Sequence, residues 1–80
     1  MYERTITILT HAQLKTTVDQ RSFECQLLSV NGARTYVIGG IEQEFTDIAP
    51  GCKISDGADV YHVRKILYWP SLKYTFIIAD

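Results

Sequence analysis

The last third of this chain constrains the fold most, because turn signals and strand signals alternate there at short intervals. A Pro-Gly pair at residues 50–51 and a glycine at position 57 mark two turns, and β-branched and aromatic residues dominate the stretches between and after them. The pattern predicts three strands joined by tight turns. We expect the strands at 52–55, 60–68 and 73–79, with turns at 56–59 and 69–71.

The first half of the chain supplies further strand signals. Residues 5–10 are β-branched at nearly every position, which favours a strand. Residues 22–30 alternate apolar and polar side chains, with Phe23, Cys25 and Leu27 on the face expected to be buried. This alternation predicts a half-buried strand.

A hairpin follows that strand. Asn31 and Gly32 suit the positive φ angles of a tight two-residue turn, so residues 34–38 should return as the next strand. The paired glycines at 39–40 then end it.

Two segments fit more than one structure. The mostly polar residues 11–22 fit a loop, a weak strand from 14 to 18 or one helical turn, and the Thr-Thr-Val run favours an extended path. In residues 41–48, Ile41, Phe45 and Ile48 have helical spacing, but alternation from Ile41 to Phe45 also fits a strand.

These signals together predict an all-β protein. Five or six short antiparallel strands with at most one short helix are typical of a small barrel or sandwich, in which exposed sheet edges are few. With 80 residues, the chain forms a single domain, residues 1–80, with one thin core. Its hydrophobic fraction of 46% is that of an ordinary globular protein, and no apolar run is long enough to cross a membrane. The amino terminus lacks the features of a secretory signal, so we expect synthesis in the cytoplasm and no membrane partner.

Charge and cysteine content exclude some function classes. Eight basic and nine acidic residues give a net charge of −1, which argues against a protein held to nucleic acid mainly by phosphate contacts. Cys25 and Cys52 have no partner at metal-ligand spacing, and we expect both to be reduced, buried and structural.

No group of residues points to a reaction. His11 and His62 lack the close spacing that a zinc site needs, and Asp56 and Asp59 are better explained as turn formers than as calcium ligands. We therefore expect no enzymatic activity, no catalytic residue, no metal, no cofactor and no small-molecule substrate.

Aromatic and basic residues in the final hairpin suggest a competing function, a stacking platform for single-stranded nucleic acid. The basic residues are Arg64, Lys65 and Lys73, and the aromatic residues are Tyr61, Tyr68, Trp69 and Tyr74. Packing in the core and at its rim explains the same aromatics, and the chain lacks an excess of positive charge.

Protein partners are the better expectation, since the chain has more aromatic and branched residues than one thin barrel can hide. We select Trp69, Tyr68 and Phe45 as partner-binding residues. Trp69 follows a strand next to Pro70 in an expected turn, where tryptophan can act as an exposed anchor. It can equally cap the mouth of its own barrel.

A Pro-Gly-Cys-Lys-Ile run at 50–54 is followed by Gly57 and by a Tyr-His-Val run at 61–63. This motif resembles a segment of small phage head-tail joining and head-closure proteins. In that family the segment forms the last strands of a compact β-barrel, although Asp commonly occupies the position of Cys52.

The resemblance implies assembly and no chemistry. Identical copies would form a ring in the neck of a virion, with portal or adaptor proteins on one side and tail proteins on the other. The protein would be made in the host cytoplasm and end in the virion. Contact regions would lie on the loops at 11–21, 39–48 and 69–72. Two different functions also fit the sequence, a nucleic-acid-binding barrel and a small inhibitor or adaptor of a host protein.

Overall fold

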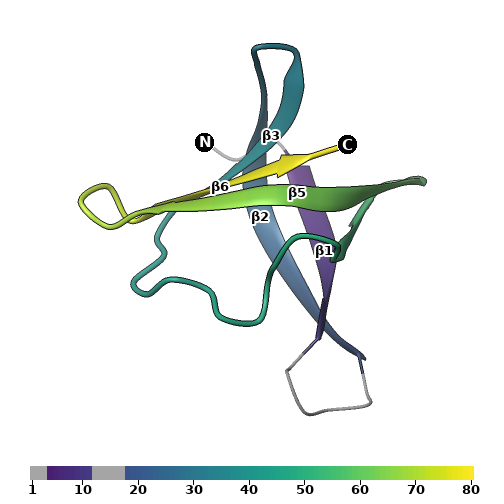
Figure 1. Ribbon diagram of the computed structural model, residues 1–80, viewed down its shortest axis with the longest axis horizontal. Helices are drawn as coiled ribbons and strands as arrows, with labels where there is room; N and C mark the ends of the chain where they lie inside the picture. The colour runs from purple at the N-terminus through teal and green to yellow at the C-terminus, as the bar shows by residue number, and fades with distance from the viewer. Residues whose placement is uncertain (1–3, 12–17) are drawn as a thin grey trace.

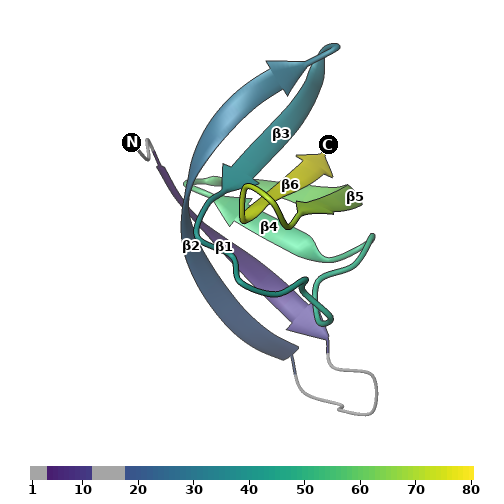
Figure 2. The ribbon, with the colours of Figure 1, turned by 90° about the vertical axis from the view of Figure 1, so that its left-hand side faces the viewer.

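The protein is a closed barrel of six antiparallel strands in the order β1-β2-β3-β6-β5-β4 in the computed structural model, which describes residues 4–11 and 18–80 (Figures 1 and 2). The expected all-β architecture is confirmed, as a barrel with six strands. The described residues contain no helix, and hence no helix able to span a membrane. The strands are β1 (Arg4–His11), β2 (Val18–Val30), β3 (Ala33–Ile38), β4 (Lys53–Asp56), β5 (Asp59–Trp69) and β6 (Tyr74–Ala79).

The segment at 41–48 is neither a helix nor a strand, so both interpretations of its spacing were wrong. Side chains fix it to the barrel in place of a backbone ladder. Ile48 is buried in the core, Phe45 packs edge-to-face on Phe23 at 5.3 Å, and Asp47 accepts a hydrogen bond from Arg21 at 2.9 Å. The apolar spacing therefore reflects a loop that lies across the barrel and buries some of its side chains.

Strand β2 begins at Val18, four residues before the predicted start at residue 22. Its polar first part is a strand because the main chain pairs with β1, as in the Ile8↔Arg21 and Leu9↔Gln20 pairs. Ladder pairing of this kind needs no apolar side chain. The predicted loop, helical turn or weak strand from 14 to 18 falls largely on residues 12–17, which lie outside the described residues.

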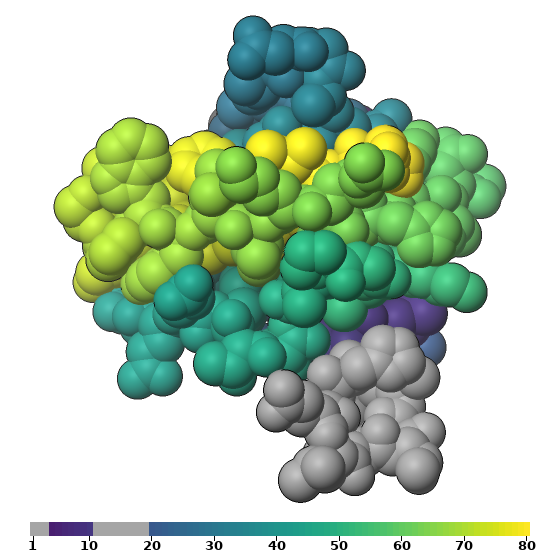
Figure 3. Space-filling model, in the orientation of Figure 1, coloured from purple at the N-terminus to yellow at the C-terminus, as the bar shows by residue number. Residues whose placement is uncertain are grey.

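The β2–β3 hairpin has the predicted turn. Asn31 and Gly32 adopt φ angles of 53° and 79°, as a type I′ turn requires. The described part of β1 pairs with β2 only as far as Cys25, whereas β3 pairs with β2 from Gln26 to Val30. The end of the hairpin therefore rises well clear of the β5–β6 ribbon (Figures 1 and 3).

The last two strands have nearly the predicted bounds. Lys73 has a φ angle of 57°, so it belongs to the turn and β6 starts one residue later than expected. Both cysteines are buried and free, as predicted.

The core consists of the inward-facing side chains of all six strands together with Ile48 and Cys52. Its fully buried members lie at every second position along their strands, as is normal for residues that point into a barrel. They include Ile6, Ile8, Cys25, Tyr36, Ile54, Val63 and Ile77.

Thr75 interrupts this apolar interior. Its side chain is fully buried, and its hydroxyl oxygen has no hydrogen-bond partner among the described residues. A buried hydroxyl without a partner loses its interactions with water and gains nothing in return.

We predict that Thr75→Val raises the free energy of unfolding by about 1 kcal/mol, because it replaces the unpaired hydroxyl with a methyl group of similar size. Urea unfolding followed by circular dichroism measures the change. Thr35→Val is the matched control, since Thr35 is also buried but donates a hydrogen bond to the carbonyl oxygen of Ala33. An equal or larger gain from the control would contradict this account.

Candidate functional site

The most unusual surface of the barrel is the outside of the β2–β3–β6–β5 sheet, which is apolar. Pairing register shows which residues share this surface: Val37 pairs with Phe76, and Phe76 pairs with Leu67. One row further along, Leu28 pairs with Thr35 and Thr35 with Ile78. We call this surface the outer apolar face and define it by Leu28, Val30, Thr35, Val37, Leu67, Trp69, Tyr74, Phe76 and Ile78.

The shape of the sheet makes this face concave. The hairpin stands at a steep angle to the β5–β6 ribbon, and the two form a corner (Figures 1 and 2). A groove of about 270 Å³ lies in this corner. Its walls are Val30 and Thr35 from the hairpin, Phe76 and Ile78 from β6, and Leu67 and Trp69 from β5.

Several large side chains of this face are open to solvent. Trp69 is 54% exposed, and Leu28, Val30, Leu67 and Tyr74 are each between 41% and 47% exposed. The ring of Phe76 lies beneath, with centroids 6.2 Å from Trp69 and 6.3 Å from Tyr74. Contiguous exposed apolar surface of this kind marks sites of interaction with other molecules.

Of the three predicted partner-binding residues, the structure places only Trp69 prominently on this face. Tyr68 points inward and donates a hydrogen bond to the carbonyl oxygen of Ile41 at 3.0 Å, although it also borders the groove. Phe45 lies on the loop, half-buried against Phe23 and under the guanidinium of Arg21 at 4.9 Å. The three side chains therefore do not form one surface.

The remaining members of the outer apolar face were missed in the sequence. A signal was present in residues 74–79, where every position but Thr75 is apolar or aromatic. A strand with one face in solvent normally alternates apolar and polar side chains. A strand that is apolar at nearly every position therefore has both faces covered or exposes an apolar face.

The aromatic residues of the final hairpin do not share one surface, because they divide between the two faces of the sheet. Tyr61 and Tyr68 point into the barrel, as Val63 does. Trp69 and Tyr74 pair with each other on the outside. Two of the basic residues are occupied in ion pairs, Arg64 with Asp80 at 2.8 Å and Lys73 with Glu42 at 3.1 Å.

A polar cluster closes the end of the barrel below the hairpin. One carboxylate oxygen of Asp56 accepts hydrogen bonds from Arg4 at 2.7 Å, from the Tyr36 hydroxyl at 2.8 Å and from Arg34 at 3.4 Å. The Arg34 guanidinium also stacks 4.0 Å from the centre of the Tyr61 ring. Side chains of β1 and β3 thus meet at the largely buried Asp56 of β4, and Tyr61 of β5 joins the cluster through Arg34.

This cluster shifts the pKa values of its members. Burial disfavours the charged form of Asp56, but hydrogen bonds from Tyr36 and Arg4 and the charges of both arginines outweigh it, so its pKa lies below the usual 3.8. Burial, followed by the hydrogen bond to Asp56, raises the pKa of Tyr36 to about 12. The neutral tyrosine and the ionised aspartate therefore stabilise each other in the folded protein.

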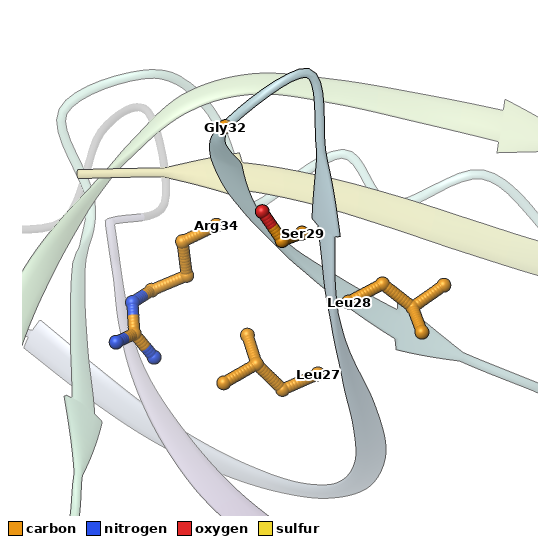
Figure 4. Close-up of a pocket in the computed structure, with 5 residues that line it drawn as sticks. All are labelled: Leu27, Leu28, Ser29, Gly32 and Arg34. Carbon is orange, nitrogen blue, oxygen red and sulfur yellow. The ribbon is translucent and has the colours of Figure 1, made fainter.

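A second hollow, of about 420 Å³, lies against the hairpin (Figure 4). Leu27, Leu28, Ser29, Gly32 and Arg34 line it. Its single charged group, Arg34, already faces Asp56.

Within residues 4–11 and 18–80, no three His, Cys, Asp or Glu side chains are grouped closely enough to hold a metal ion.

Comparison with known proteins adds no family. No family model matches the chain, and neither curated proteins nor solved structures give a significant match. Inference about function therefore rests on the geometry of this fold.

The ionised Asp56 predicts a pH-dependent stability. Because its folded-state pKa is lowered, its contribution is present above the usual pKa and is lost as pH falls through the folded-state value. We predict that Asp56→Asn lowers the free energy of unfolding at pH 7 by about 2 kcal/mol and reduces the further loss below pH ~4.

Thermal and urea unfolding of wild type and variant at pH 7 and pH ~3 measure both effects. Asp59→Asn is the matched control, because Asp59 pairs with Asp56 across the turn but is exposed. A control as destabilising as Asp56→Asn would show that the cluster has no special role.

Proposed function

We propose that this protein is a non-enzymatic assembly component that binds protein through the outer apolar face. The observation that carries the proposal is the exposure of Trp69 and four other large apolar side chains on one concave surface. Interfaces between proteins are enriched in aromatic side chains and depleted of charge at their centres. Tryptophan in particular is common among the residues that dominate binding energy.

Identical copies are the first partner to consider. The net charge of −1 creates little repulsion between copies. Among the outward-facing residues of β3, β6 and β5 beyond its bulge, Lys65 is the one charged side chain. A second copy can therefore approach this face without removing many charges from water.

The resemblance to phage head-tail joining and head-closure proteins supports a more specific form of the proposal. In this form, copies made in the host cytoplasm associate head to tail into a ring in the neck of the virion, between a portal or adaptor and the tail. Contacts of that kind close into rings when the rotation between neighbours divides a full turn. The small barrel described above has the architecture that the resemblance implies.

The proposal predicts that Trp69→Glu weakens self-association at least about tenfold, because it places a charge where the exposed anchor lies. Light scattering on a sizing column, over a range of protein concentrations, measures the oligomer. Val60→Glu is the matched control: Val60 is 58% exposed on the same strand but lies outside the outer apolar face.

The same column run with a short single-stranded oligonucleotide tests the competing function. We expect the oligomer to be indifferent to the oligonucleotide at low and high salt. A monomer that shifts only with the oligonucleotide at low salt would contradict the proposal and favour nucleic-acid binding. A monomer indifferent to it at all concentrations would contradict self-assembly and leave an inhibitor or adaptor of a host protein as the surviving function.

A further inference from the structure

The inner face of the β2–β3 hairpin places an arginine, a serine and a leucine around one hollow. Ser29 pairs directly with Arg34 in the ladder, so their side chains are neighbours on the same face of the hairpin. Figure 4 shows both on the same side as Leu27, whereas Leu28 projects to the opposite side. Together with Gly32, these residues line the hollow of about 420 Å³. The hollow therefore combines a positive charge, a hydroxyl group and an apolar wall.

The guanidinium group of Arg34 is fixed from two directions. Its Nη1 donates hydrogen bonds to the Tyr36 hydroxyl at 3.1 Å and to the Asp56 carboxylate at 3.4 Å. Its central carbon lies 4.0 Å from the centre of the Tyr61 ring, which covers one face of the group. A donor that is already held in place loses little conformational freedom when it binds a ligand.

The opposite edge of this guanidinium group is unused. Within residues 4–11 and 18–80, Nε and Nη2 of Arg34 donate a hydrogen bond to no other residue. The side chain keeps 29% of its surface exposed. The Nε–H bond and one Nη2–H bond point the same way, and their spacing matches the two oxygens of a carboxylate. Arg34 therefore has a free two-pronged donor at the hollow.

The acidic neighbour of Arg34 leaves its charge only partly compensated. Asp56 is the one acid paired with Arg34 in the described part of the chain, and the same oxygen lies 2.7 Å from Arg4 and 3.4 Å from Arg34. Charge-assisted hydrogen bonds are normally about 2.7–2.9 Å long, so the contact with Arg34 is the weaker of the two. None of the described residues that line the hollow is acidic. An anion that enters the hollow thus meets a positive group and no carboxylate in its lining.

We propose that the hollow binds a carboxylate carried on a short aliphatic stem. Nε and Nη2 of Arg34 donate to the two carboxylate oxygens, and the stem packs on Leu27. Ser29 supplies a further donor, because it is exposed and its hydroxyl has no hydrogen-bond partner among the described residues. A glutamate side chain of another protein and a free short-chain carboxylate share this chemistry.

This inference goes beyond the proposed function and does not depend on it. The hollow lies on the inner face of the hairpin, whereas Leu28 of the outer apolar face projects to the other side (Figure 4). Binding of a carboxylate and association through the outer apolar face can therefore be tested separately.

Pentanoate is the probe, and pentanamide is its neutral control, because the two molecules have nearly the same shape and differ in charge. We expect pentanoate to shift the NMR signal of the Arg34 Nε–H group saturably and to bind at least about tenfold more tightly than pentanamide. Titration of the full chain measures both affinities. Equal binding of the two molecules, or no saturable shift at Arg34, overturns the inference.

Two further ligands define the chemistry of the site. A blocked Ala-Glu-Ala peptide that binds as pentanoate does supports a glutamate side chain as the natural ligand, and a peptide that does not bind supports a free carboxylate. Inorganic phosphate that binds as tightly as pentanoate would overturn the inference, because it would show a site for anions in general.

Ser29→Ala tests the site without changing the Asp56 cluster, and we expect it to weaken pentanoate binding about fivefold. Ser71→Ala is the matched control, because Ser71 is also an exposed serine but lies in the turn between β5 and β6. Arg34→Lys keeps the positive charge but lacks the two-pronged donor, so it should weaken binding at least about tenfold. Wild-type affinity in Ser29→Ala, or in a folded Arg34→Lys, would contradict the proposed site.

Discussion

The structure depends on the central position of β6, which pairs with β3 on one side and β5 on the other. Its inward residues, Thr75, Ile77 and Ala79, are buried in the core. The residues on the opposite face of the strand therefore cannot be buried there as well. Tyr74, Phe76 and Ile78 are thereby fixed on the outside of the sheet, where the neighbouring strands add Leu67 and Trp69. The apolar exterior is a consequence of the strand order and of a strand that is apolar on both faces.

Stability of the fold and association with other molecules use different parts of the barrel. At the barrel end, the Asp56 carboxylate of β4 binds side chains of β1 and β3 within one chain. On the outer apolar face, exposed hydrophobic area remains for a second molecule to cover. Stability and association therefore depend on different residues, so variants such as Asp56→Asn and Trp69→Glu should separate them.

Much of the fold could be predicted from the sequence because the signals are local. Alternation identified β2, β-branched residues identified β1, and Asn31 with Gly32 identified the hairpin turn. The loop at 41–48 could not be predicted, since its structure comes from tertiary contacts such as Arg21 with Asp47. Of the outer apolar face, only Trp69 was predicted from the sequence. The other residues come together because β3, β6 and β5 lie side by side, and no local sequence pattern encodes that strand order.

The measurement that tests the central claim most directly is the fluorescence emission of Trp69, the only tryptophan in the chain, as a function of protein concentration. In an isolated copy the indole is more than half exposed, at 54%. If this face is an interface between copies, emission shifts to shorter wavelength as concentration rises, in step with the increase in mass from light scattering. An emission maximum that stays at the position of solvent-exposed tryptophan while oligomers form would contradict the account.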